Sequence, residues 1–146
     1  MKVGVISDTH NVLREDVIAY LEGCDYIIHA GDVCQLDILE RLNEIAKTFV
    51  VAGNNDKSLK LPHELEIELE DCKIYIVHHK LDIPQNMNHV DLIIYGHSHK
   101  YEYDVREGII YLNPGGCGRR RFSLPLTMAF LHLNEGKIEI EKVELT

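Results

Sequence analysis

The sequence lacks the cysteine spacing that zinc ribbons and disulfide scaffolds require. Its four cysteines, Cys24, Cys34, Cys72 and Cys117, are widely separated and form no Cys-x-x-Cys pair. That distribution argues against a structural zinc ribbon and against a disulfide framework. The sequence also lacks an apolar run of about 20 residues, and Asp8 follows the first short apolar segment too early for a signal peptide. We therefore expect a soluble, cytoplasmic protein that does not enter a membrane.

Positive charge is also scarce, because 15 lysines and arginines face 24 acidic residues, for a net charge of −9. A general nucleic-acid surface gains its affinity from cationic contacts to phosphates, so this balance disfavours one. A small phosphorylated substrate remains compatible with it. No repeats or low-complexity segments interrupt the 146 residues, 45% of which are hydrophobic. A chain of that size and composition can bury a core as one domain spanning residues 1–146.

The first third of the chain alternates between buried strands and amphipathic helices. Apolar runs predict strands, and apolar residues at helical spacing predict helices between them. Strands are expected at 2–6, 25–29 and 48–52, with helices within 13–23 and 38–46. Alternation of this kind predicts a parallel sheet with right-handed crossovers.

The rest of the chain favours hairpins. An antiparallel pair is expected on either side of a turn at Asp71-Cys72, and a buried strand at 91–95. Two more hairpins are expected, from 101–106 to 109–112 and from 126–133 to 137–144, because both pairs meet at glycine-containing turns. The stretch 83–90 is expected to be a short helix or an irregular connection. The natural architecture is α/β, with two mixed sheets packed together and helices outside.

Polar side chains that can bind metal ions cluster just after the predicted strands. Because ligand sites of α/β sheets gather at the carboxyl ends of strands, we expect these side chains to converge on one rim. They comprise three oxygen donors and four imidazoles: Asp8, His10, Asp32, Asn54, His78, His97 and His99.

This donor set is too large for one ion and suits two. Without a thiolate, it suits manganese, iron, nickel, zinc or cobalt rather than copper(I) or an iron–sulfur cluster. Asp32 is expected to bridge the ions, since a carboxylate can bind two cations, and Gly31 lets the backbone turn sharply before it. In an extended segment, His97 and His99 would point to opposite sides, one toward each ion.

Other polar residues have less specific interpretations. His29 is expected to pack beside the site without binding an ion. Asp56 either orients Asn54, binds a metal's water or stabilises a turn. The run Arg119-Arg120-Arg121 reaches a substrate phosphate, forms a solvated charged surface or contacts another subunit. The remaining side chains are expected to be structural or on the surface: His63, His89, His132 and Cys117.

Five ordered motifs, Asp-x-His, Gly-Asp, Gly-Asn, a later His and Gly-His-x-His, resemble those of the calcineurin-like metallophosphoesterases. The form Ser7-Asp8-Thr9-His10 and the short chain resemble their small bacterial and archaeal phosphodiesterase branch. The resemblance spans Val3 through Asn113-Pro114-Gly115. It implies a four-layer αββα sandwich and two divalent ions, with manganese or nickel favoured.

Carried over residue by residue, the resemblance assigns the ligands to two ions that share Asp32. It implies that one ion takes Asp8, His10, Asp32 and His99, and the other takes Asp32, Asn54, His78 and His97. Two positions depart from the family pattern. His79-Lys80 replaces the usual Gly-His after His78, and Asn55 stands where many relatives have a histidine.

The resemblance implies a hydrolase that cleaves phosphodiester bonds by attack of a metal-bound hydroxide. A phosphomonoesterase is one alternative. Another is a non-catalytic scaffold, as the retromer subunit of this family is understood to be with its catalytic histidines altered. All seven ligand positions here carry competent donors, which favours the enzyme. The expected partner is a small phosphoester substrate, and a homodimer or homotetramer stays open.

Overall fold

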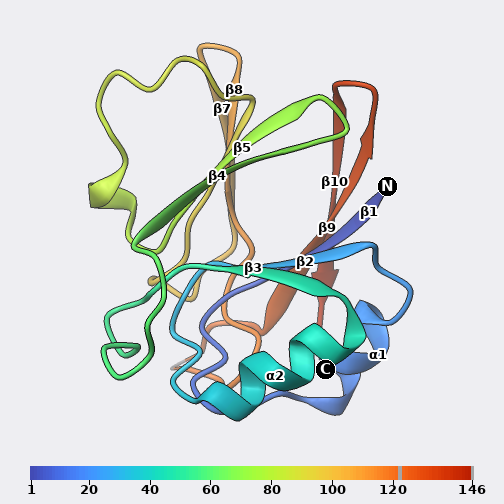
Figure 1. Cartoon of the computed structure of the whole chain (residues 1–146), viewed down its shortest axis with the longest axis vertical. Helices are drawn as coiled ribbons and strands as arrows, with labels where there is room; N and C mark the ends of the chain where they lie inside the picture. Colours follow the sequence, from blue (N-terminus) through green and yellow to red (C-terminus); the bar gives the residue numbers. More distant parts are fainter. Residues whose placement is uncertain (122, 146) are drawn as a thin grey trace.

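The computed structural model describes residues 1–121 and 123–145. The expected order of strands and helices is present, and Figure 1 shows it along the chain. The elements are β1 (Lys2–Ile6), α1 (Glu15–Leu21), β2 (Tyr26–His29), α2 (Leu36–Ile45), β3 (Lys47–Val50), β4 (Glu64–Leu69), β5 (Cys72–Val77), the 3₁₀ turn η1 (Lys80–Asp82), β6 (Leu92–Ile94), β7 (Glu102–Arg106), β8 (Ile109–Asn113), β9 (Thr127–Asn134) and β10 (Lys137–Glu144).

The strands form two mixed sheets of five, as the sequence predicts. The first has the order β10-β9-β1-β2-β3, in which β1, β2 and β3 are parallel. The second has the order β4-β5-β6-β8-β7, in which β5, β6 and β8 are parallel. The parallel strands form one side of the first sheet and the centre of the second, and the remaining strands pair with them in antiparallel fashion.

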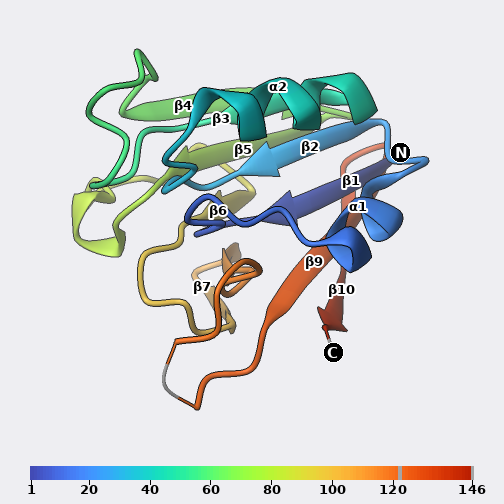
Figure 2. The same ribbon diagram turned by 90° about the horizontal axis from the view of Figure 1, so that it is seen from below.

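The two sheets pack face to face over a buried aliphatic core. Alternate residues of each strand point into it, for example Ile28 from the first sheet and Ile76 and Ile94 from the second, all fully buried. Apolar faces of α1 and α2 cover the outer side of the first sheet, and Figure 2 shows both helices lying on that sheet. The layers follow the expected αββα order.

The fourth layer is thin. The outer face of the second sheet, including Tyr75 and Ile93, is covered by apolar side chains of the connection that follows η1. Residues 83–90 form an irregular connection, so the second of the two alternatives for this stretch is confirmed. Among the described residues, no helix has the length and apolar character needed to span a membrane.

The hairpin turns follow one backbone pattern. Glu107-Gly108 and Glu135-Gly136 both have positive φ at their two central residues, as a twisted two-residue hairpin requires. The first hairpin turns at Glu70 and Asp71, with φ of 48° and 61°, so the prediction of a turn at Asp71-Cys72 was one residue too late. Cys72 instead pairs with Leu69 and begins β5, where its side chain is buried.

Candidate metal centre

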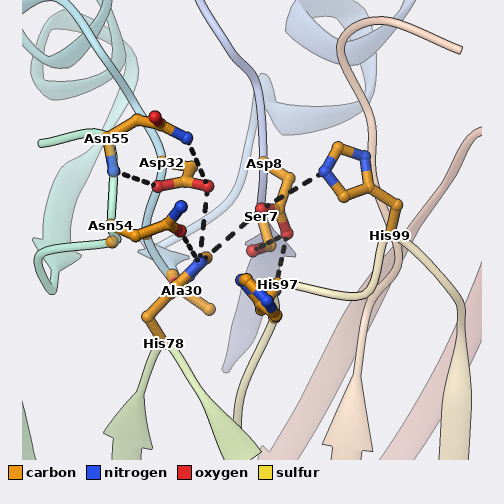
Figure 3. A network of polar contacts seen from close by, with 12 residues as sticks. Ser7, Asp8, Ala30, Asp32, Asn54, Asn55, His78, His97 and His99 are labelled. Carbon is orange, nitrogen blue, oxygen red and sulfur yellow. Dashed lines mark hydrogen bonds and ion pairs between the residues drawn. The ribbon is translucent and has the colours of Figure 1, made fainter. Parts of the chain in front are cut away.

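The loops after β1, β2, β3, β5 and β6 bring donor atoms together at one end of the sandwich. Figure 3 shows side chains from all five loops facing one another. One group consists of Asp8, His10 and His99, and a second consists of Asp8, Asp32 and His78. Within each group the ligand atoms lie within 4.8 Å of one another. Parallel strands from both sheets therefore converge on a single rim, as the sequence predicts.

Asp8 is fully buried and uses only one of its carboxylate oxygens within the protein. The Ser7 hydroxyl donates to Oδ2 at 2.7 Å, and the backbone N–H of His97 donates to the same atom at 3.1 Å. Oδ1 is buried and has no hydrogen-bond partner among the described residues. A buried charged oxygen without a donor is costly, so this atom calls for a cation.

Three imidazoles surround that orphaned oxygen. The Nε2 atoms of His10 and His99 each lie 3.7 Å from Asp8 Oδ1, and that of His78 lies 3.9 Å from it. These distances are too long for hydrogen bonds. They leave space for a cation that contacts both the oxygen and the nitrogens. The donors present therefore fit metal ions.

Asp32 lies between two of these histidines. Its Oδ2 is 3.4 Å from Nε2 of His10 and 3.4 Å from Nε2 of His78. Those two histidines belong to different ions in the assignment that the family resemblance implies. Asn55 holds the carboxylate in place, since its backbone N–H donates to Oδ1 at 2.9 Å and its side-chain amide donates to Oδ2 at 3.2 Å.

His78 is oriented as a metal ligand. Its Nδ1–H donates to the carbonyl of Ala30 at 2.7 Å, which leaves the Nε2 lone pair pointing at the carboxylates. Asn54 Oδ1 lies 3.2 Å from this Nε2 and also faces the carboxylate of Asp32. These neighbours are hydrogen-bond acceptors. If the side-chain nitrogen of Asn54 faces them, it donates to them. If the side-chain oxygen faces them instead, a cation is needed between the oxygen and these acceptors.

The loop carrying His97 and His99 differs from the expected extended segment. Both residues have positive φ, 74° and 64°, because the chain turns directly after β6. Their side chains still diverge. His99 faces Asp8, whereas the ring of His97 lies 5.3 Å from that of His78 and 4.3 Å from that of His79, between centroids. His97 belongs to neither group of converging donors, so its role as a ligand stays a prediction.

Left-handed backbone is concentrated at the predicted ligands. A positive φ is uncommon for residues other than glycine, and such strain gathers at functional sites. Gly31, with φ of 106°, completes the turn before Asp32, and a Cβ there would lie 2.5 Å from Nδ1 of His78. Five of the predicted ligands adopt positive φ: Asp8, His10, Asp32, His97 and His99.

Electrostatics keep both carboxylates ionised. Burial opposes ionisation of Asp8, but His10 and the Ser7 hydroxyl outweigh it and lower the pKa. Burial opposes ionisation of Asp32 as well, but the positive charge that His78 and His10 can carry and the backbone N–H of Asn55 outweigh it and lower the pKa well below its usual range. Burial lowers the pKa of His97 and of His99, which favours the neutral form that binds metals.

His29 packs beneath the site, as predicted. It is fully buried, and burial lowers its pKa to about 4, so the ring is neutral. Its Nδ1 accepts the N–H of Gly31 at 3.1 Å, so Nε2 carries the proton and donates to the Thr9 hydroxyl at 3.1 Å. The ring thereby ties the loop after β1 to the loop after β2.

Several other side chains lie outside the site. His63, His89 and His132 lie on the surface beside the carboxylates of Asp82, Glu66 and Glu141. Lys80 pairs with Glu102 at 3.7 Å. Cys117 is buried as a small residue, and burial raises the pKa of its thiol to about 12.

Asp56 holds two of the ligand loops together, a function that its place in a turn-forming sequence obscured. Its Oδ2 accepts the backbone N–H groups of Asp32 at 2.8 Å, Gly53 at 2.9 Å and Val33 at 3.3 Å. Its Oδ1 accepts the N–H of Cys34 at 2.7 Å. The contact with Gly53 agrees with the turn that was one of the roles weighed from the sequence. The clamp between the loops that carry Asp32 and Asn54 was not among those roles.

A cavity of about 550 Å³ opens beside this centre. His10 and His99 form part of its wall, so it is continuous with the first group of donors. Cys34 also borders it, but burial and the nearby carboxylates raise the pKa of this thiol to about 11, which disfavours a thiolate ligand. The remaining lining residues are Asn11, Asn55, Arg119, Arg120 and Arg121.

Comparison with known proteins agrees with this geometry. The model of the calcineurin-like phosphoesterase superfamily domain matches residues 1–136. The chain belongs to this superfamily. A probable metallophosphoesterase of Methanocaldococcus jannaschii is 36% identical over 130 residues, covering 79% of this chain and 67% of the relative. A phosphodiesterase of the same archaeon is 29% identical over 140 residues, covering 80% and 84%.

The fold is shared with a solved structure. A single mutant of Vps29 from Entamoeba histolytica superposes with a TM-score of 0.80 over the whole of both chains, at 22% identity. At that identity the likeness concerns the fold alone, and it agrees with the expected αββα sandwich. The family match over residues 1–136 confirms the expected superfamily.

The clamp leads to a prediction about Asp56. In the wild type, several backbone N–H groups donate to the Asp56 carboxylate. Replacing it by asparagine (Asp56→Asn) puts an amide N–H₂ group, itself a donor, against some of them. We expect the metal-free protein to lose about 1–3 kcal/mol of unfolding free energy. We also expect the affinity for manganese to fall about 10- to 100-fold, because the ligand loops lose their fixed spacing. Denaturant unfolding and calorimetric titration with manganese measure the two effects.

Asp71→Asn is the matched control, since Asp71 is an exposed residue of the β4–β5 turn. It should change stability by less than about 0.5 kcal/mol and leave manganese binding unaltered. Wild-type manganese affinity in Asp56→Asn would show that the clamp does not position the ligands.

Proposed function

We propose that this superfamily member is a phosphodiesterase that depends on two divalent ions, with manganese or nickel as the native metal. The observation that carries the proposal is the buried, unpartnered Oδ1 of Asp8 facing three imidazole nitrogens. Asp32, placed between His10 and His78, supports a second ion beside the first. A relative named as a phosphodiesterase supports the diester specificity.

The residues divide into two proposed ligand sets that share Asp32. Asp8, His10 and His99 would hold one ion with Asp32, while Asn54, His78 and His97 would hold the other with it. Two such ions activate water, polarise phosphoryl oxygens and stabilise the charge that builds up during an in-line displacement. Backbone turns at the strand ends fix these side chains before substrate binds, so little reorganisation is needed.

The chain's own hydrogen bonds keep the ligands in their binding form. Ala30 accepts the Nδ1–H of His78, and Ser7 occupies Oδ2 of Asp8 so that Oδ1 remains available. Asn55 fixes the orientation of Asp32 with two donors.

Asn55 bears on the choice between diesters and monoesters. A departing oxygen gathers negative charge, and an acid that protonates it contributes roughly 10²–10⁴-fold in rate. An amide cannot give up a proton at useful pH, and here the backbone N–H and the side-chain amide of Asn55 both donate to Asp32. The site should therefore favour esters with good leaving groups, which places activated diesters ahead of monoesters.

The scaffold alternative predicts a protein that binds partners and does not need its metal ligands. The likeness to Vps29 concerns the fold and does not decide between the two functions. The complete set of donors favours the enzyme, because a scaffold has no need to keep a buried carboxylate oxygen unpaired among imidazoles.

Removing metal is the first test. Dialysis against a chelator should abolish hydrolysis of bis(p-nitrophenyl) phosphate, and manganese, nickel or cobalt should restore it. The far-ultraviolet circular dichroism should not change, because the sheets and helices pack through apolar residues away from the ligand loops. Calorimetric titration should show two ions bound per chain. Undiminished hydrolysis by the metal-free protein would exclude the proposed function, and binding of a single ion would exclude the two-ion centre.

Asn55→His tests the diester preference. The wild type should have a higher kcat/KM for a p-nitrophenyl diester than for p-nitrophenyl phosphate. The variant should gain relatively more on the monoester, because it adds a group that can protonate the departing oxygen. Asn11→His places an imidazole elsewhere in the same cavity and should not shift the ratio. A wild-type preference for the monoester would refute the argument, and an unchanged ratio in Asn55→His would assign the acid to another residue.

A further inference from the structure

The loop after β8 is fastened to the metal centre by its backbone. The N–H of Gly116 donates to the carbonyl of His99 at 3.2 Å, and the N–H of Cys117 donates to the carbonyl of Ser7 at 3.3 Å. At Gly118, a Cβ would lie 2.0 Å from the carbonyl oxygen of Thr9, so only glycine fits against this loop. The chain that follows therefore starts directly beside the loops that carry Asp8, His10 and His99.

Three consecutive arginines follow this anchored glycine. Arg119, Arg120 and Arg121 are exposed, and all three line the cavity that His10 and His99 also border. Within residues 1–121 and 123–145, Arg119 and Arg120 form no ion pair with a carboxylate. In a chain with a net charge of −9, this concentration of positive charge at one cavity requires an explanation.

Guanidinium groups pair with phosphate oxygens in a fork geometry that few other side chains match. Ions bound at the proposed metal centre would supply the positive charge that holds the phosphate being cleaved. A cavity of about 550 Å³ has room for a nucleotide-sized group beyond that phosphate. Cations along its wall therefore suit a second anionic group on the same substrate.

We propose that Arg119, Arg120 and Arg121 form a subsite for a second phosphate group, so that the preferred substrates are phosphodiesters that carry a further phosphate. This inference rests on the proposed phosphodiesterase function and specifies its substrate class. The arginines act on binding and selectivity, and the metal ligands act on the bond that breaks.

A matched pair of substrates tests the subsite. One is the p-nitrophenyl ester of thymidine 5′-phosphate, and the other is the same ester with an additional 3′-phosphate. With the manganese-loaded wild type, the 3′-phosphorylated ester should have the lower KM. The triple variant R119A/R120A/R121A should raise its KM on the order of tenfold or more. The KM of the unphosphorylated ester should change less than about twofold, and kcat should stay unchanged for both esters.

Two further variants distinguish recognition of the second phosphate from the loss of any surface arginine and from the effect of positive charge alone. Arg106→Ala removes an exposed arginine that pairs with Asp104 in β7, next to the hairpin turn, and should alter neither KM. The triple lysine variant keeps the charge but loses the fork geometry, so its KM for the 3′-phosphorylated ester should be intermediate. Circular dichroism should show the same fold in all variants.

The outcomes distinguish the subsite from the proposed function. If the wild type hydrolyses both esters with equal KM, or the triple alanine variant weakens both equally, the subsite is wrong and the phosphodiesterase function stands. If the wild type hydrolyses neither, the proposed function fails. Calorimetric titration of the metal-free protein with thymidine 3′,5′-bisphosphate then decides the subsite. Binding that is lost in the triple alanine variant and kept in Arg106→Ala supports it, and binding equal in all three proteins, or absent, overturns it.

Discussion

Two buried carboxylates at the ends of neighbouring strands set the central constraint on this molecule. Oxygens of Asp8 and Asp32 belong to one group whose ligand atoms lie within 4.8 Å of one another. Like charges about 4 Å apart repel by about 4 kcal/mol at an effective dielectric constant of 20. The protein keeps both ionised by surrounding them with imidazoles and donors, and an Oδ1 of Asp8 left without a donor calls for cations. Divalent cations bound among these groups would balance the two negative charges.

The fold meets this constraint by aiming two sets of parallel strands at the same end. β1, β2 and β3 in one sheet, and β5, β6 and β8 in the other, all finish where the donors gather. The first loops turn through left-handed residues, and the clamp of Asp56 fixes the distance between the loops after β2 and β3. The loop after β8 adds arginines at the rim. An apolar core between the sheets and under the helices holds the strands from which these loops extend.

The convergence of the candidate donors on one rim could be predicted because its sequence signals are local. Asp8, His10, Asp32, His78 and His99 follow strands whose apolar runs are easily recognised, and strand ends of one sheet must share an edge. The two mixed sheets follow from the same alternation of runs and turns. Where prediction failed, the reason was backbone conformation. An extended segment was expected at His97 and His99, but positive φ at both residues reflects a tight turn that periodicity does not reveal.

Contacts between loops that are far apart in the chain could not be predicted from the sequence. Asp56 was open to interpretation as a turn residue, and Asn55 stood out only as a departure from the family pattern. Their bonds to Asp32, across 23 or 24 positions in the chain, depend on the fold. The arginine run was open to three interpretations until the packing of Gly118 against Thr9 placed it at the cavity.

We propose that Asp32 lies between two ions, and anomalous diffraction from manganese-loaded crystals tests this position. We expect two anomalous peaks about 3.5–4 Å apart with the Asp32 carboxylate in contact with both. A single peak, or two peaks of which Asp32 contacts only one, would contradict it.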